Sequence, residues 1–284
     1  MAVEFRVAIA EDVPELGRIC YEAFKDISER HGFEPDFPSV ELASLVVGLL
    51  VQNEDVQSVA AVDGGVLRGS NFLNMWGDIG GIGPISVDPG AQGEGIGRKL
   101  MLDALAHAAQ QGVEMVRLCQ DAFNMQSLAL YASVGFVVRE PLAYLALSTA
   151  GPADADCRPG TADDLDAMEE LSRRVYGVSR RGEGALLMQL GFPCLVRERG
   201  GRVRGYLLGT AMGHGLAESD ADLLALMASM GASTEDAHAF VPMRNGELYR
   251  QALAAGHRNQ KVMNLMSVGP YEEPVGTWAP SVMF

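Results

Sequence analysis

Hydrophobic and polar positions follow two periods in the first half of the chain, and these predict a mixed sheet covered by helices. Short apolar or alternating runs between turn residues indicate strands, whereas apolar spacings of three to four residues indicate helices. The predicted strands are residues 3–9, 57–62, 66–74, 79–87, 113–119 and a broken strand pair over 136–147 with Pro141 at its bend. Four helices are predicted. The first begins at residue 10, the second covers residues 40–51, the third runs from the glycine-rich segment 88–97 to about residue 110, and the fourth covers residues 125–134. This order predicts an α/β fold of the α+β mixed-sheet type, with helices on both faces.

The second half of the chain repeats landmarks of the first. The matching segments are 6–24 with 158–176, 64–69 with 200–205, and 124–136 with 245–257. Three matches in the same order argue for duplication of one unit of roughly 140 residues. Small polar residues with proline and glycine fill 148–156, which is the best linker candidate. The sequence therefore predicts two domains, residues 1–148 and 149–284.

The charge of the chain restricts its partners. The formal net charge of the 284 residues is −15. Binding to nucleic acid draws on clusters of lysine and arginine, so nucleic acid is not expected as a partner. Only Lys25, Lys99 and Lys261 are lysines. The acidity suits solubility, and it would also suit a cationic small substrate.

The cysteines and apolar runs bear on compartment and metal content. The four cysteines form no CxxC pair, and each lies in or beside an apolar stretch, as buried thiols do. We therefore expect no metal site. The first residues lack the pattern of a signal peptide, and the longest apolar run, 42–51, is about half a membrane span. The sequence predicts a cytoplasmic protein that does not insert into membranes.

A glycine-rich segment between a predicted strand and a predicted helix carries the candidate chemistry. Gly93, Gly95 and Gly97 alternate at the start of the helix. Because glycine has no Cβ, the backbone can approach a ligand closely there. The first N–H groups of a helix have no helical acceptor and lie at the positive end of its dipole. Together with Arg98 and Lys99, they predict a site for a phosphate or pyrophosphate.

Two common phosphate-binding motifs are excluded by their spacing. A P-loop requires serine or threonine after its lysine, but Lys99 is followed by Leu100. A dinucleotide-binding fold requires G-x-G-x-x-G after its first strand. Here the glycines are spaced G-x-G-x-G after the fourth or fifth strand.

The same residues resemble a known family. The segment Gln92-Gly93-Glu94-Gly95-Ile96-Gly97 resembles the Q/R-x-x-G-x-G/A acetyl-CoA loop of the GNAT N-acetyltransferase superfamily. The preceding Ile85-Ser86-Val87-Asp88-Pro89 resembles that family's V-x-P strand end. Further along, Asn124, Leu130-Tyr131 and Gly135-Phe136 resemble its N…LY…GF segment.

The resemblance covers about residues 3–147 and extends in weaker form to the second half. It implies two tandem GNAT-like acyl-CoA N-acyltransferase domains. Residues 1–148 would be the catalytic domain with the acetyl-CoA loop, and residues 149–284 a degenerate copy. Where the first copy carries its glycine loop, the second carries Met212-Gly213-His214-Gly215-Leu216-Ala217-Glu218-Ser219-Asp220, which has no glycine-alternating turn leading into a helix.

The resemblance also implies roles for individual residues toward acetyl-CoA as a co-substrate. The pantetheine arm would pair with strand backbone, and the pyrophosphate would lie on loop amides. The residues implied to bind it are Ile85, Ser86, Val87, Gln92, Gly93, Gly95, Ile96, Gly97, Arg98, Asn124 and Ser127. Tyr131 would protonate the leaving thiolate, a role that suits a phenol with a pKa of about 10.

The general base and the acceptor are less defined. Asp78, Glu34 and Asp36 are candidate bases, and each also reads as a solvated surface acid. The acceptor is expected to be a primary amine of a small molecule that enters where the two copies meet. Two other functions stay open, a non-catalytic acyl-CoA sensor or pseudoenzyme, and a protein or peptide N-acetyltransferase. A monomer and a homodimer are both compatible with the sequence.

Overall fold

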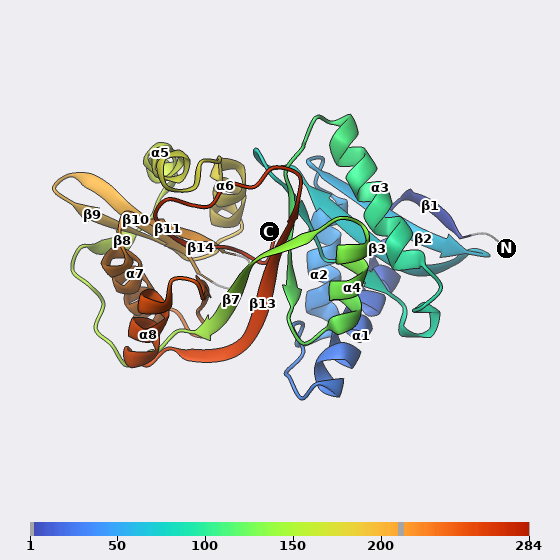
Figure 1. Cartoon of the computed structure of the whole chain (residues 1–284), viewed down its shortest axis with the longest axis horizontal. Coiled ribbons are helices and arrows are strands. Elements are labelled where there is room, and N and C mark those ends of the chain that lie inside the picture. The colour runs from blue at the N-terminus through green and yellow to red at the C-terminus, as the bar shows by residue number, and fades with distance from the viewer. Residues whose placement is uncertain (1–2, 210–212, 284) are drawn as a thin grey trace.

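The chain folds around two β-sheets with helices on both faces of each (Figure 1). This computed structural model describes residues 3–209 and 213–283. The strands of the first half and their continuation are β1 (Glu4–Val7), β2 (Val56–Asp63), β3 (Val66–Asn74), β4 (Gly80–Ile82), β5 (Ser86–Val87), β6 (Val116–Asp121) and β7 (Val137–Ala146). Those of the second half are β8 (Cys157–Pro159), β9 (Cys194–Arg199), β10 (Arg202–Leu208), β11 (Gly215–Ala217), β12 (His238–Pro242), β13 (Arg258–Val268) and β14 (Thr277–Ala279).

Eight α-helices and three short 3₁₀ turns are described between these strands. The helices are α1 (Val13–Arg30), α2 (Val40–Val51), α3 (Ile96–Gln110), α4 (Met125–Ser133), α5 (Leu165–Tyr176), α6 (Arg181–Gln189), α7 (Asp220–Ser233) and α8 (Gly246–Ala254). The 3₁₀ turns are η1 (Ala10–Asp12), η2 (Pro89–Ala91) and η3 (Ala162–Asp164). The mixed α/β fold predicted from the sequence is confirmed.

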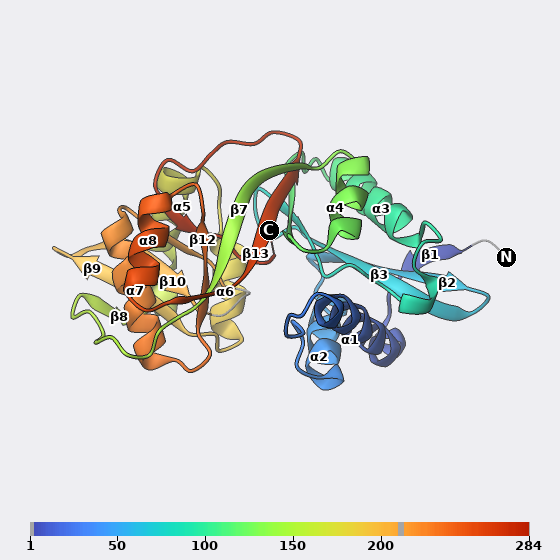
Figure 2. The same cartoon turned by 60° about the horizontal axis from the view of Figure 1, so that its bottom comes forward.

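The larger sheet is mixed. Its order is β1-β2-β3-β4-β6-β13-β7-β12, and β5 pairs with β3 off this path. Its strand pairs are antiparallel except for β4 and β6, which are parallel. Helices α1 and α2 cover one face and α3 and α4 the other (Figure 2). The smaller sheet has the order β14-β11-β10-β9-β8 and lies entirely in the second half.

Strands are exchanged between the two halves in the larger sheet. β13, from the second half, lies between β6 and β7 of the first, and β12 extends the sheet beyond β7. β7 and β13 therefore run side by side through the middle of the molecule (Figure 1). A boundary at Ser148 separates the two halves in the sequence, but the larger sheet contains strands from both sides of it. Side chains of β13 consequently reach the first half.

The predicted strand over residues 79–87 is wrong as a single element. The structure divides it into β4 and β5, which are separated by Gly83, Pro84 and Ile85. Pro84 has no N–H to donate to a ladder, so pairing stops there. β4 pairs with both β3 and β6, whereas β5 pairs with β3 alone.

The predicted broken pair over residues 136–147 is also wrong, because β7 is one strand of ten residues with Pro141 inside it. Met243 N donates to Pro141 O at 2.9 Å. In a strand, the N–H and C=O of one residue point to the same side, so the missing N–H of Pro141 faces β12. The ladder of β12 ends there, at Pro242. The proline therefore leaves the ladder between β7 and β13 unbroken, and it faces β12 where the β12 ladder ends.

Corresponding contacts occur in the two halves at the positions that match in sequence. Arg6 pairs with Asp12 through two bonds of 2.6 and 2.8 Å, and Arg158 pairs with Asp164 at 2.9 and 2.8 Å. In each half the aspartate also accepts a backbone N–H at the start of a 3₁₀ turn. Asn124 and Asn245 each cap a helix through their side-chain oxygens. These shared contacts are what a duplicated unit would retain.

We predict that Asp12→Asn lowers the free energy of unfolding by about 1–2 kcal/mol at pH 7, because it removes a capping carboxylate and its ion pair. Bonds from Arg6 and from the Ile9 N–H hold the pKa of Asp12 below its ordinary value. The stabilisation is therefore complete above the unfolded pKa of about 3.9 and is lost as the pH falls through the lowered pKa. Urea unfolding at several pH values measures this. The exposed neighbour change Glu11→Gln is the control, and an equal loss for both variants would contradict the prediction.

The cysteines lie where the sequence places them. Cys20 and Cys194 are buried, Cys119 and Cys157 are half-buried, and all four are free thiols. Burial raises the pKa of Cys20 and of Cys119 to about 12, so neither is a ready nucleophile at neutral pH. Within residues 3–209 and 213–283, no three His, Cys, Asp or Glu side chains gather as a metal site would require. No helix in this part of the chain is both long and apolar enough to cross a membrane.

Candidate functional site

The ladder of the larger sheet is interrupted between β5 and the end of β6. β4 and β6 pair only at Gly80 with Val116 and at Gly81 with Arg117. Beyond Arg117, β6 pairs with β13 on one edge, and β5 pairs with β3 on its far edge. Two strand edges therefore face each other with no described strand between them. Their backbone N–H and C=O groups can pair with an extended ligand in the way that an added strand would.

The predicted glycine loop follows directly from β5. Gly93 and Gly95 have φ values of +86° and +81°, which side-chain-bearing residues rarely adopt. A Cβ built on either glycine would meet no atom within 4 Å, so the loop keeps open space on that side. Gly97 differs, because its Cβ would lie 3.3 Å from Leu130 Cδ2. The first two glycines shape an open cradle, and the third lets α3 pack against α4.

The N-terminus of α3 presents donors to this cradle. The first helical hydrogen bond that follows the loop runs from Lys99 N to Gly95 O at 3.2 Å. The N–H groups of Ile96, Gly97 and Arg98 thus precede any helical acceptor and carry the positive end of the dipole. Arg98 is exposed. An anion, phosphate above all, suits this position.

Gln92 joins the loop to the interrupted strand. Its Nε2 donates to Val87 O at 3.3 Å. The carbonyl oxygen of Val87 therefore accepts one hydrogen bond within the protein. The side chain of Gln92 fixes the loop relative to β5, so the open strand edge and the cradle keep one spacing.

Asn124 and Ser127 organise the first turn of α4. The Oδ1 atom of Asn124 accepts from Ser127 N at 3.0 Å. The hydroxyl of Ser127 donates to Asn124 O and accepts from Gln120 Nε2, both at 3.0 Å. The structure thus uses the oxygens of both side chains for capping. The Nδ2 group of Asn124 is the donor that is left for a ligand.

Tyr131 lies on α4, in the core between that helix and the sheet. Its side chain is 7% exposed and packs near Phe136, with ring centroids 6.2 Å apart. Burial, with a smaller contribution from the Asp121 carboxylate, raises the pKa of the phenol. Tyr131 therefore keeps its proton at neutral pH and can act as a donor.

This arrangement lies within a segment that matches the model of a known family. The model of the Acetyltransferase (GNAT) family matches residues 18–136, which are under half of the chain. This stretch contains the interrupted ladder, the glycine loop and Tyr131. Residues 18–136 therefore resemble a GNAT acetyltransferase domain, and this stretch is called the GNAT domain below. The match leaves the second half outside the family model.

Curated relatives of the GNAT domain share only part of their length with this chain. A mycothiol acetyltransferase from Thermobispora bispora is 32% identical over 126 residues, which are 44% of this chain and 38% of that protein. The mycothiol acetyltransferase of Thermomonospora curvata is 45% identical over 58 residues, 20% of each chain. The chain thus matches well under half the length of these relatives.

Solved structures share the fold of the whole chain. A protein from Pyrococcus horikoshii assigned as an acetyltransferase superposes with a TM-score of 0.77 at 16% identity, over 96% of this chain and 92% of that one. A GCN5-related N-acetyltransferase from Sphaerobacter thermophilus superposes with a TM-score of 0.64 at 18% identity, over 97% and 98% of the two chains. The arrangement of the GNAT domain with a second half is therefore a fold found elsewhere.

Among the described residues, the matching region of the second half has no glycine-alternating turn at a helix N-terminus. Ser219 Oγ caps α7 by accepting from Asp222 N at 3.3 Å, and acids fill the first turn of that helix. β14 pairs along β11, from Ala217 with Thr277 to Gly215 with Ala279. The chain's own C-terminal strand thus covers the edge that would face a ligand. Met212, the first residue of the segment compared with the glycine loop, lies outside the described residues.

The three acids predicted as bases lie in different surroundings. Asp78 accepts from Ser179 N at 2.8 Å and pairs with Arg173, so it joins the two halves. Glu34 is exposed. Asp36 is bound at 2.5 Å by Lys261, which lies on β13. Asp36 is therefore not simply a solvated acid.

The sequence reasoning missed two charged residues near the interrupted ladder. Asp121 ends β6, and Lys261 Nζ lies 2.7 Å from its Oδ1. Their side chains are 9% and 8% exposed. A signal was present in the rarity of lysine, since Lys261 is one of three. Only the exchange of β13 into the first half, however, reveals its partner.

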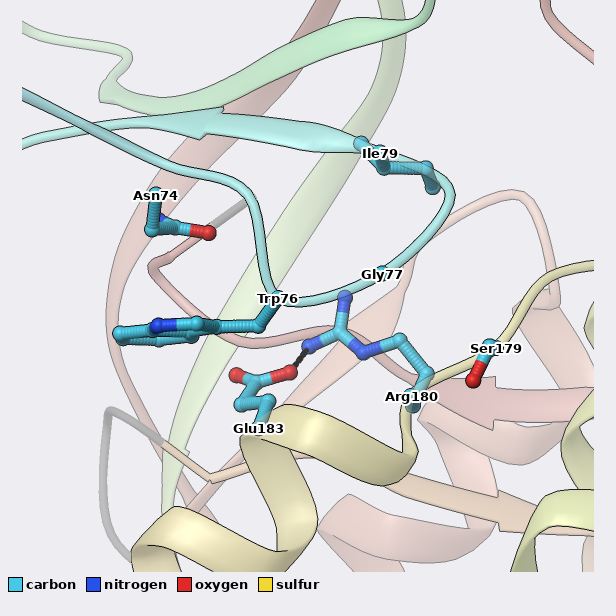
Figure 3. Close-up of a pocket in the computed structure, with 7 residues that line it drawn as sticks. All are labelled: Asn74, Trp76, Gly77, Ile79, Ser179, Arg180 and Glu183. Atoms are coloured by element: carbon cyan, nitrogen blue, oxygen red, sulfur yellow. Dashed lines mark ion pairs between the residues drawn. The ribbon is translucent and has the colours of Figure 1, made fainter. Parts of the chain in front are cut away.

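A small pocket lies where the two halves meet. The end of β3 supplies Asn74, the loop after it supplies Trp76, and the start of α6 supplies Arg180 and Glu183. Figure 3 shows the Arg180 guanidinium paired with the Glu183 carboxylate across from Asn74. Both charged side chains are almost fully buried. This ion pair within the second half therefore lies at the junction with the GNAT domain.

Proposed function

We propose that the protein is an acetyl-CoA-dependent N-acetyltransferase that acts on a primary amine of a small molecule. The observation that carries the proposal is the open strand edge of β5. It leads directly into the glycine cradle and faces the edge of β6, after which the helix that bears Tyr131 begins. A family model that matches residues 18–136 supports it.

The residues around the interrupted ladder fit an extended ligand that ends in phosphates. Ile85, Ser86 and Val87 line the open edge, and their backbone groups that point away from β3 would pair with a pantetheine arm. Gly93, Gly95, Ile96, Gly97 and Arg98 would hold the pyrophosphate, and Gln92 keeps their loop in place. Asn124 would contact the arm through Nδ2, while Ser127 supports the turn. Acetyl-CoA, when bound, supplies an activated acetyl group as a thioester.

Tyr131 would donate a proton to the departing sulfur. The phenol is buried and its pKa is raised, so the donor form is the one present at neutral pH. A thiol is acidic enough to leave once a donor is close. The dry environment strengthens such a hydrogen bond relative to one in water.

The two halves would have different roles. Residues 1–148 would bind the co-substrate, and residues 149–284 would be a degenerate copy of the same unit. The paired contacts of Arg6 with Asp12 and Arg158 with Asp164 support the duplication. The Ser219 cap and β14 support the loss of co-substrate binding in the second copy.

A transfer assay tests the proposal and separates it from its rivals. Pure protein with acetyl-CoA is offered small primary amines, amino sugars, the deacetylated form of mycothiol and basic peptides. Thiol release and product mass are measured. We expect transfer to at least one small amine. Transfer only to peptides, or binding of acetyl-CoA with no transfer at all, would contradict the proposal and favour a peptide acetyltransferase or a sensor.

A further inference from the structure

Three charged side chains from distant parts of the chain meet at the end of β6. Asp36 comes from the segment between α1 and α2, Asp121 ends β6, and Lys261 belongs to β13. Lys261 Nζ lies 2.5 Å from Asp36 Oδ1 and 2.7 Å from Asp121 Oδ1. The Asp121 and Lys261 side chains are both more than nine-tenths buried.

Strand exchange brings these groups together. β13 runs antiparallel to β6 with Met263 opposite Asp121, and Ala122 N donates to Val262 O at 3.0 Å. Lys261 is thus carried just past the end of β6. On its other side, its Nζ lies 5.9 Å from the centre of the Tyr144 ring. The second half of the chain therefore supplies the only described cation within ion-pair distance of Asp121.

The cluster borders the interrupted ladder. From Leu118 onward, β6 has no described strand on the edge that faces β5, and Asp121 is the last residue of that segment. Its negative charge contributes to the raised pKa of the Tyr131 phenol on α4. Asp121 also lies three residues before the Asn124 cap. A carboxylate at this place lies beside the region proposed for the thioester, across from the proton donor.

The charges in the cluster do not balance. One ammonium group faces two carboxylates, so the cluster is more favourable to a proton or a cation than to an anion. The titratable groups that face Asp121 are Asp36, Lys261, Tyr131, Tyr144 and Cys119. Burial and Asp36 raise the pKa of Asp121 to about 6, while Lys261 opposes them. A base with this proton affinity is mostly deprotonated at neutral pH and still binds a proton readily.

We propose that Asp121 is the general base that takes a proton from the acceptor amine, and that Lys261, contributed by the second half, is the positioning residue that holds its carboxylate. This inference rests on the proposed acetyl transfer. It gives the degenerate half a part in the reaction, through β13, without a ligand of its own.

The proposed step moves one acetyl group and releases one proton. The acceptor arrives as an ammonium ion, and one proton passes to the Asp121 carboxylate and then to water. The freed nitrogen bonds to the acetyl carbon as the carbon–sulfur bond breaks, with the electron pair leaving on sulfur. Tyr131 donates a proton to that sulfur. The nitrogen then loses its second proton to solvent, and solvent returns a proton to Tyr131. The products are an amide, a free thiol and one released proton.

The first test reads the titration of Asp121 directly and needs no acceptor. Chains labelled with ¹³C at aspartate carboxyls are titrated by NMR, and the signal absent from Asp121→Asn is assigned to Asp121. We expect Asp36→Asn to lower the midpoint and Lys261→Met to raise it, each by at least about threefold in proton affinity. Lys25→Met removes a half-buried lysine that lies 3.8 Å from Glu29 and 5.6 Å from the centre of the Tyr21 ring, and it should leave the midpoint unchanged. An Asp121 midpoint that ignores both neighbours would overturn the proposal.

The second test uses the amine found in the transfer assay. We expect Asp121→Asn to lower kcat by about 100-fold or more with acetyl-CoA affinity changed less than threefold. The acid limb of the kcat/KM profile should move to lower pH in Asp36→Asn and to higher pH in Lys261→Met. In Lys261→Arg it should return to its position in the unaltered protein. Full activity of Asp121→Asn would overturn the base assignment while leaving acetyl transfer intact. No transfer to any amine by the unaltered protein would overturn both proposals.

Discussion

Replacing Gly95 by valine should weaken acetyl-CoA binding by about 100-fold or more, which is roughly 2.7 kcal/mol. Gly95 has a φ of +81°, and a Cβ at this position would project into space that no other described atom fills. On our account that space belongs to the pyrophosphate. The branched side chain would therefore block the ligand and also shift the N–H groups of Ile96 and Gly97 out of position. Titration calorimetry of each variant with acetyl-CoA measures the loss.

The control for this change is Gly112→Val. Gly112 follows α3 with a φ of +75°, and a Cβ there would also meet no atom within 4 Å. Both variants should lose a similar 1–2 kcal/mol of stability, because a branched residue is strained in the left-handed region. Only Gly95→Val should lose the ligand. Equal affinity in both variants would show that the cradle does not bind the phosphates.

Replacing Tyr131 by phenylalanine should lower kcat by about 100-fold and change the affinity for acetyl-CoA by less than threefold. The change removes one oxygen atom from a side chain that is 7% exposed and keeps the ring against Phe136. The packing of α4 is thus retained while the proton donor is lost. Initial rates at saturating co-substrate, with calorimetry on the same samples, separate these two effects.

Tyr249→Phe provides the matched control for the second half. Tyr249 lies on α8, which Asn245 caps as Asn124 caps α4. Because the second half lacks the glycine cradle, this change should leave kcat within twofold. A large loss of rate in Tyr249→Phe, or none in Tyr131→Phe, would place the proton donor elsewhere.

Local signals in the sequence predicted most of the GNAT domain. The glycine loop and the strand-to-helix order depend on turn and periodicity rules that act over a few residues. The same rules mispredicted residues 79–87 and 136–147. In both segments a proline had to be judged by which edge of a strand it faces, and that depends on partners far away in the chain. Pro84 ends a ladder, whereas Pro141 lies inside β7 without interrupting its ladder with β13.

The charged cluster could not be predicted in the same way. Asp121 and Lys261 are 140 positions apart, and their meeting depends on β13 inserting between β6 and β7. Treating the halves as two separate units hides this contact, because each unit alone contains only part of the cluster. The repeat found in the sequence stays a prediction, and the larger sheet contains strands from both halves.

We propose that the first half, and only the first half, binds acetyl-CoA. Titration calorimetry of the pure chain with acetyl-CoA, and with desulfo-CoA as a probe of the phosphate cradle alone, measures this binding. We expect one site per chain for both ligands, lost in Gly95→Val and kept in Gly112→Val. Absence of binding, or two equivalent sites per chain, would contradict it.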